Sequence, residues 1–69
     1  MKLLHKGTSV RVRPGDVVRT TDTGQYVTVA GWDPTTLYVH AWAGAADVGD
    51  MRRHEPWSAH FLNMIWVDD

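Results

Sequence analysis

Two valine-rich segments joined by a glycine-containing turn constrain the fold of this chain more than any other feature. They follow Pro14-Gly15, in which proline presets φ and glycine tolerates a positive φ, so we expect a type II turn there. Asp16 can hold that turn by a hydrogen bond to nearby backbone. Residues 17–21 and 25–32 are rich in β-branched residues, and the turn cluster 22–24 separates them. The pattern predicts an antiparallel β-hairpin.

Three further segments are predicted to be strands. Residues 9–13 alternate apolar and polar side chains, as a half-buried strand does. Residues 37–42 follow a break at 33–36, and residues 61–67 form a strong closing strand. The expected result is an all-β domain of five strands.

The segment between the last two strands is harder to interpret. Residues 44–50 are small and acidic, so we expect an exposed loop there. Residues 51–60 are ambiguous and allow at most one helical turn, because Pro56 opposes a longer helix.

Strict alternation of side chains gives the predicted hairpin of residues 25–42 two faces. An aliphatic set suited to the interior comprises Val27, Val29, Leu37, Val39 and Ala41. An aromatic and polar set on the opposite face comprises Tyr26, Thr28, Trp32, Tyr38, His40 and Trp42. A bulge at Gly31 would turn Trp32 inward. If exposed, the aromatic set predicts an interaction surface, since Tyr and Trp are enriched in binding hot spots. The alternatives are that Trp32 or Trp42 packs over an end of the domain, or that the face mediates self-association.

Chain length and cysteine content limit how this fold is stabilised. The 69 residues suffice for a single domain, 1–69, with a marginal core. The absence of cysteine excludes disulfides, thiolate zinc sites and cysteine nucleophiles, so we expect a homo-oligomer. The sequence has neither a run of ~20 apolar residues nor a signal-peptide pattern. We therefore expect a cytoplasmic protein with no membrane partner.

Charge is unevenly distributed along the chain. Residues 1–20 carry five basic side chains and one acidic one, whereas residues 21–50 carry four aspartates and no base. Arg11, Arg13 and Arg19 are candidate phosphate contacts, and Tyr and Trp side chains offer stacking surfaces for bases. Nucleic-acid binding is therefore an alternative function. The simpler interpretation of the basic residues is a solvated strand face without a partner.

The segment from His54 to His60 contains the residue types of a metal or catalytic site. Its histidine spacing does not match a helical pair, and Pro56 lies between them, so no metal is expected. Ser58 and His60 lack an evident orienting acid or oxyanion element, so no catalytic residue is assigned. We expect no cofactor. An oligomeric small enzyme with its site at a subunit interface is a second alternative.

About half of the chain, residues 14–42, resembles known small barrels. The segment from Arg13 to Trp32 resembles the opening of KOW-type and related SH3-like barrels, and residues 14–42 are similar to small bacterial proteins of the YodC type. The matching residues are Gly15, Asp16, Val18, Arg19, Gly24, Thr28, Val29 and Trp42. This resemblance implies a single small SH3-like five-stranded barrel or a strongly bent antiparallel sheet, and it implies no established activity.

A second resemblance concerns the plasmid-borne trimethoprim-resistance dihydrofolate reductases. Gly15-Asp16, Val18-Arg19 and the Gly31-Trp32 pair after Val29 are similar to their scaffold. Their active site uses a Val-Gln-Ile-Tyr segment, whereas the nearest candidate here, residues 63–66, lacks both Gln and Tyr. The resemblance supports the fold and counts against the enzyme.

These observations predict a non-enzymatic accessory or adaptor module that binds a protein partner through an aromatic surface. The residues assigned to that surface are Tyr26, Trp32, Tyr38, His40 and Trp42. Arg11, Arg13 and Arg19 would steer an acidic partner toward it.

Overall fold

The computed structural model describes residues 1–44 and 54–69. These residues form two antiparallel sheets and contain no α-helix, which confirms the predicted all-β class. The loop expected at residues 44–50 lies outside the described residues from position 45 onward, as do the first residues of the ambiguous 51–60 segment.

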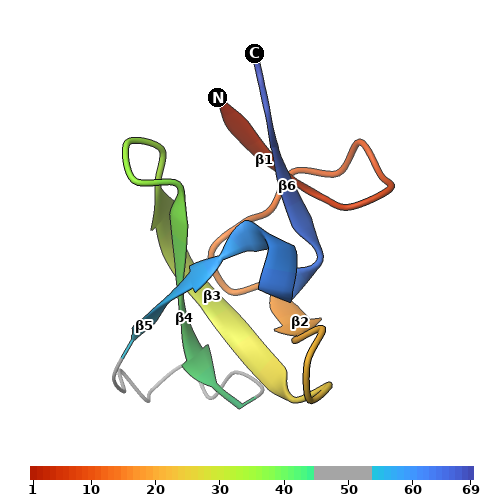
Figure 1. Ribbon diagram of the computed structural model, residues 1–69, viewed down its shortest axis with the longest axis vertical. Helices are drawn as coiled ribbons and strands as arrows, with labels where there is room; N and C mark the ends of the chain where they lie inside the picture. The colour runs from red at the N-terminus through yellow and green to blue at the C-terminus, as the bar shows by residue number, and fades with distance from the viewer. Residues whose placement is uncertain (45–53) are drawn as a thin grey trace.

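One sheet joins the two ends of the chain, whereas the other is built from four strands that are consecutive in the sequence (Figure 1). The smaller sheet pairs β1 (Lys2–His5) with β6 (Met64–Val67). The larger has the order β2 (Val17–Arg19), β3 (Tyr26–Asp33), β4 (Tyr38–Ala43) and β5 (Glu55–Ser58). A 3-10 turn, η1 (Ala59–Leu62), connects β5 of the larger sheet to β6 of the smaller. Pairing among the described residues does not close the sheets into one barrel.

The predicted hairpin and the turn before it are confirmed. β2 pairs with β3 so that Val18 lies opposite Val27. Gly15 has a φ of 93°, the conformation for which glycine was expected. The carboxylate of Asp16 accepts a 2.8 Å hydrogen bond from the Arg13 backbone N–H, as its position in the turn predicts.

The predicted strand at residues 9–13 is wrong. Only Arg11 in that segment pairs, in an isolated bridge to Leu4, and the first strand is β1. The segment folds back on β1 through a hydrogen bond from the Val12 N–H to the Leu3 carbonyl, 3.0 Å long. Its alternation is real, since Val12 is buried and Val10 is exposed, but the pairing partner of β1 is β6. That choice depends on residues at the opposite end of the sequence.

Two expectations at the C-terminal end need correction. The ambiguous segment contains strand β5, in which Pro56 is tolerated because β5 is an edge strand of the larger sheet. The closing strand begins at Met64 rather than at residue 61, since Phe61 and Leu62 belong to η1. Asn63 ends that turn in the left-handed conformation, with a φ of 54°.

The core lies on the inner face of the larger sheet and beneath η1. From the predicted aliphatic set Val27, Val29, Val39 and Ala41 are buried, and the remaining buried apolar residues are Leu3, Val12, Ala59, Leu62 and Met64. Leu37 departs from the prediction: it lies in the β3–β4 turn with a φ of 63° and is exposed. The connection between β3 and β4 is too tight to return its side chain to the core.

Candidate functional site

The register of the larger sheet assigns the predicted aromatic residues to its two faces. β3 pairs with β4 so that Thr28 lies opposite Trp42, and a bulge shifts the register between Val29 and Gly31. Beyond that bulge Trp32 pairs with the buried Val39, so Trp32 packs against the core. The inward turn anticipated for a bulge near Gly31 is therefore present. Trp32 does not belong to the outer face.

The outer face retains the other predicted aromatic residues and one arginine. Tyr26, Tyr38, His40 and Trp42 lie on it by alternation, and Arg19 lies opposite Tyr26. Trp42 is half-buried and stacks on His54, with ring centroids 5.5 Å apart. Its ring face on that side is therefore already covered.

Arg19 and Tyr26 form a preorganised cross-strand pair. The Arg19 guanidinium lies 4.7 Å from the centre of the Tyr26 ring, and its Nη2 donates a 2.9 Å hydrogen bond to the Tyr26 hydroxyl. Both side chains remain exposed. Cation–π contact of this kind holds an arginine and an aromatic ring together on a surface.

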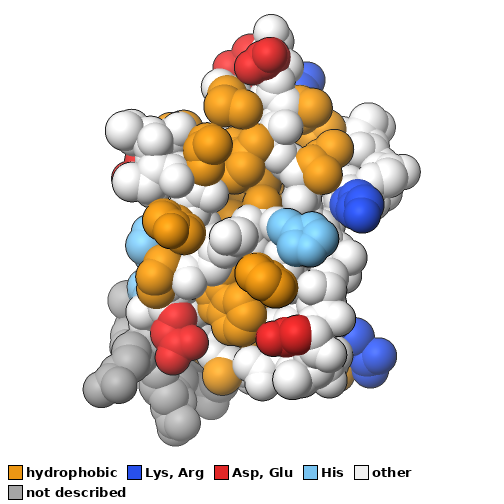
Figure 2. All heavy atoms as spheres, viewed as in Figure 1, with side chains coloured by type: hydrophobic (Ala, Val, Ile, Leu, Met, Phe, Trp, Pro, Cys, Tyr) orange, Lys and Arg blue, Asp and Glu red, His pale blue; other side chains and the backbone are white. Residues whose placement is uncertain are grey.

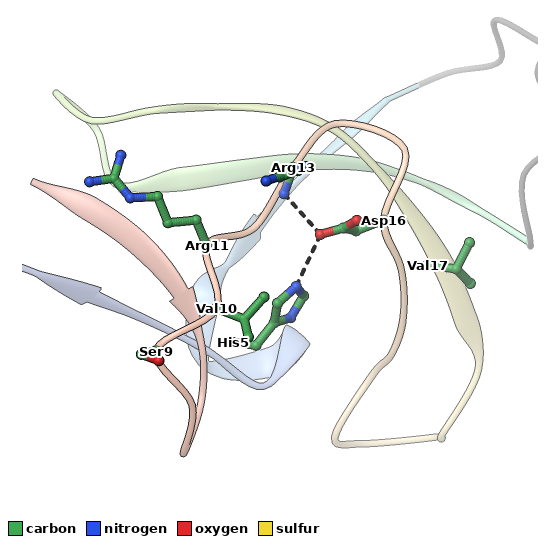
Figure 3. Close-up of a pocket in the computed structure, with 7 residues that line it drawn as sticks. All are labelled: His5, Ser9, Val10, Arg11, Arg13, Asp16 and Val17. Atoms are coloured by element: carbon green, nitrogen blue, oxygen red, sulfur yellow. Dashed lines mark hydrogen bonds and ion pairs between the residues drawn. The ribbon is translucent and has the colours of Figure 1, made fainter.

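Arg11 and Arg13 lie elsewhere, in the wall of an open hollow of about 760 Å³ (Figure 3). The hollow is lined by His5, Ser9, Val10, Arg11, Arg13, Asp16 and Val17. Asp16 lies between the turn and β1: it accepts the Arg13 N–H and lies 3.0 Å from His5 Nε2. Figure 3 shows the Arg11 side chain extending away from this pair. None of the predicted aromatic residues lines this hollow.

A second concavity joins residues that the sequence analysis did not combine. This groove, about 250 Å³ in volume, is lined by Asp22, Tyr38, Pro56, Trp57, Ser58 and Phe61. Tyr38 is 46% exposed and Phe61 42% exposed, which is unusual for side chains of their size. Figure 2 shows hydrophobic side chains over the side of the molecule formed by β5, η1 and β6. Of the groove residues, only Tyr38 was assigned to a binding surface from the sequence.

Asp22 gives the groove a negative charge. Hydrogen bonding to the Thr20 side chain and to the Thr23 backbone N–H lowers the pKa of the Asp22 carboxyl below its ordinary value of 3.8. The bond from the Thr23 N–H is 2.6 Å long. The carboxylate therefore stays ionised at neutral pH, at the rim of an otherwise aromatic surface.

The two histidines of the 54–60 segment pack against different aromatic rings. His54 stacks on Trp42, whereas the His60 ring packs edge-on against Phe61 at 5.4 Å. Within the described part of the chain no three His, Asp or Glu side chains gather closely enough to hold a metal ion. In that same part, no helix has the length and apolar character needed to cross a membrane.

Comparison of the chain with family models, with curated proteins and with solved structures finds no match.

Proposed function

We infer that the protein is a non-enzymatic interaction module that binds an extended segment of a partner protein in the groove of Tyr38, Trp57 and Phe61. The observation that carries this inference is the convergence of these three rings, with Pro56, on one concave surface. Aromatic side chains in a partly desolvated pocket are the usual anchors of protein binding. The occupant is a partner segment with an apolar side chain beside a lysine or arginine.

The groove combines a ring packed against the core with an exposed one. Trp57 packs against the hydrophobic core, so this ring loses little side-chain entropy when a partner binds. Phe61 is 42% exposed, so its ring is accessible to a partner. A volume of about 250 Å³ accommodates a few side chains and lies below the range of about 300–1,000 Å³ that is usual for small-molecule pockets.

Charge complementarity indicates which residue of the bound segment lies next to its apolar anchor. Asp22 is the single charged residue in the groove lining, and its carboxylate is ionised at neutral pH. A lysine or arginine next to the apolar anchor would meet this charge at the rim. A neutral or acidic segment would gain nothing from it.

Strand addition at the neighbouring edge is a less suitable binding mode. β5 is an edge strand, but Pro56 in its middle has no backbone N–H to donate to an added strand. Recognition by side chains in the groove does not need that donor. The position of Pro56 therefore favours a partner segment that the groove recognises through its side chains.

A displayed library of random peptides tests this function. We expect the purified protein to enrich peptides with an apolar residue next to a basic one. Phe61→Ser should weaken a selected peptide by about 30-fold, the factor for a hot spot worth 2 kcal/mol. Val10→Ser is the matched control, because Val10 is also apolar and 58% exposed but lies outside the groove.

The charge is tested separately with Asp22→Asn. This variant should weaken peptides with a basic residue and leave those with a neutral replacement unchanged. Selected peptides that bind Phe61→Ser as well as the unaltered protein, or that shift NMR signals only outside the groove, would contradict the proposed function.

A further inference from the structure

The hollow beside β1 and the turn before β2 is basic, and it is separate from the aromatic groove. Its wall contains Arg11, Arg13 and His5, the hydroxyl of Ser9, and a single acid, Asp16. It also belongs to the part of the sequence in which basic residues outnumber acidic ones by five to one, residues 1–20. The net charge of −1 for the whole chain hides this local excess.

The acidic residue in the lining of the hollow, Asp16, already has two polar partners. Asp16 Oδ2 accepts the Arg13 backbone N–H at 2.8 Å and lies 3.0 Å from His5 Nε2. Among residues 1–44 and 54–69, neither Arg11 nor Arg13 has a carboxylate within 4.0 Å of its guanidinium. Their donors therefore remain available to an external oxyanion, for which the planar guanidinium is well suited.

We propose that this hollow binds the phosphate groups of a single-stranded nucleic acid, whose bases then reach the Arg19–Tyr26 pair. Val17 connects the two places: it lines the hollow and shares the outer face of β2 with Arg19. Two residues along a strand span about 7 Å, so the Arg19–Tyr26 pair lies close to the edge of the hollow. The Tyr26 ring and the Arg19 guanidinium that covers one of its faces together offer a flat surface on which an unpaired base stacks.

The shape of the surface favours a nucleic acid over free phosphate. A volume of about 760 Å³ is larger than one phosphate needs, and exposed Val10 and Val17 make part of the wall apolar. A nucleotide chain uses the arginines, the apolar wall and the Tyr26 ring together. A lone phosphate uses only the arginines. Because a base in a duplex is not free to stack on Tyr26, the strand bound is single.

The first test measures fluorescence anisotropy of a labelled oligothymidylate of about 12 nucleotides, within the site sizes of about 4–16 nucleotides known for single-strand-binding domains. The affinity is measured over a series of salt concentrations. Arg11→Ala/Arg13→Ala should make the slope of log K against log salt shallower by about 1.4, since each lost contact to a single strand removes about 0.7. Alanine at position 13 keeps the backbone N–H that holds Asp16.

Lys2→Ala/Lys6→Ala is the matched control, because it removes the same two charges from residues that do not line the hollow. It should leave the slope unchanged. An equal decrease of the salt slope in the two double variants would overturn the proposal, because it would show only a general attraction of the oligonucleotide to positive charge. Undetectable binding by the unaltered protein at low salt would overturn it as well.

The second test concerns the ring. Tyr26→Phe keeps the stacking surface and loses only the hydroxyl bond to Arg19, so it should bind within about twofold of the unaltered protein, whereas Tyr26→Ala should lose about fivefold or more. Equal binding by the two variants would refute the stacking step. Competition by inorganic phosphate, by duplex DNA or by polyglutamate at the same concentration of charge would overturn the assignment to a single strand.

Discussion

Replacement of Leu62 by alanine tests how the two sheets are held together. Leu62 ends η1, the turn that contacts both β5 and β6, and its side chain is 0% exposed. Leucine-to-alanine changes at such sites cost about 2.7–5.0 kcal/mol, so we expect a loss of about 3 kcal/mol. A chain of 69 residues has a total stability of about 3–10 kcal/mol. The variant should therefore lie close to its unfolding threshold.

The assay is urea unfolding followed by tryptophan fluorescence and circular dichroism, with thermal unfolding as a second measurement. A loss of about 3 kcal/mol corresponds to a decrease in Tm of about 12–24 °C for a domain of this size. Phe61→Ala is the control: Phe61 is the adjacent residue and has the larger side chain, but it is 42% exposed. It should cost about 1 kcal/mol or less.

The comparison separates burial from side-chain size. If size alone determined the effect, Phe61→Ala would be the more damaging change. A loss for Phe61→Ala equal to that for Leu62→Ala would refute the position of Leu62 as the buried contact between the sheets. Coincident fluorescence and circular dichroism transitions would show that unfolding remains two-state, and an unchanged m-value that the surface exposed on unfolding is the same.

Three further predictions concern the backbone and the turns. Gly15→Ala should cost about 1 kcal/mol or more in urea unfolding because φ is 93° there, whereas Gly31→Ala should be tolerated because its Cβ meets no atom within 4 Å. Trp66→Phe should lose about 1 kcal/mol by the same assay, because it removes the 3.1 Å hydrogen bond from the indole to the Leu37 carbonyl. Hydrogen bonding to backbone lowers the pKa of Asp33 below 3.8, so this carboxylate stabilises the fold above that pH and the stabilisation is lost as pH falls through the lowered pKa. Asp33→Asn should accordingly lose less stability than the unaltered protein when acidified below pH 3.8.

The parts of the fold that were predicted correctly depend on neighbouring residues. The positive φ of Gly15 and the hydrogen bond of Asp16 follow from the requirements of a tight turn. The burial of Val27 and Val29 and the exposure of Tyr26 follow from side-chain alternation. Thr28, which the same rule placed with Tyr26, is 0% exposed, and its hydroxyl donates a 2.8 Å hydrogen bond to the Gly44 carbonyl. The possibility of a bulge near Gly31 was also apparent, although its presence had to be established by the register of β3 against β4.

The candidate sites were only partly predictable. Arg19 and Tyr26 were assigned to binding from their residue types, and the structure places them in direct contact. Trp57 and Phe61 were not assigned, because the segment that contains them has no clear periodicity. Their groove requires β5 to pair with β4 and η1 to fold over the end of the sheet, and neither event has a local signal.

Local sequence patterns were enough to predict the β class, the turn at Gly15 and the burial of Val27, Val29, Val39 and Ala41 in the hairpin from β3 to β4. These features arise from φ preferences and side-chain alternation, which act between neighbours. The pairing of β1 with β6, the packing of Trp32 against the core, and the groove lined by Tyr38 and Phe61 became apparent only in the folded chain. Pairing between distant segments depends on the total apolar surface area that the whole chain buries on folding. That area cannot be derived from any local stretch of sequence.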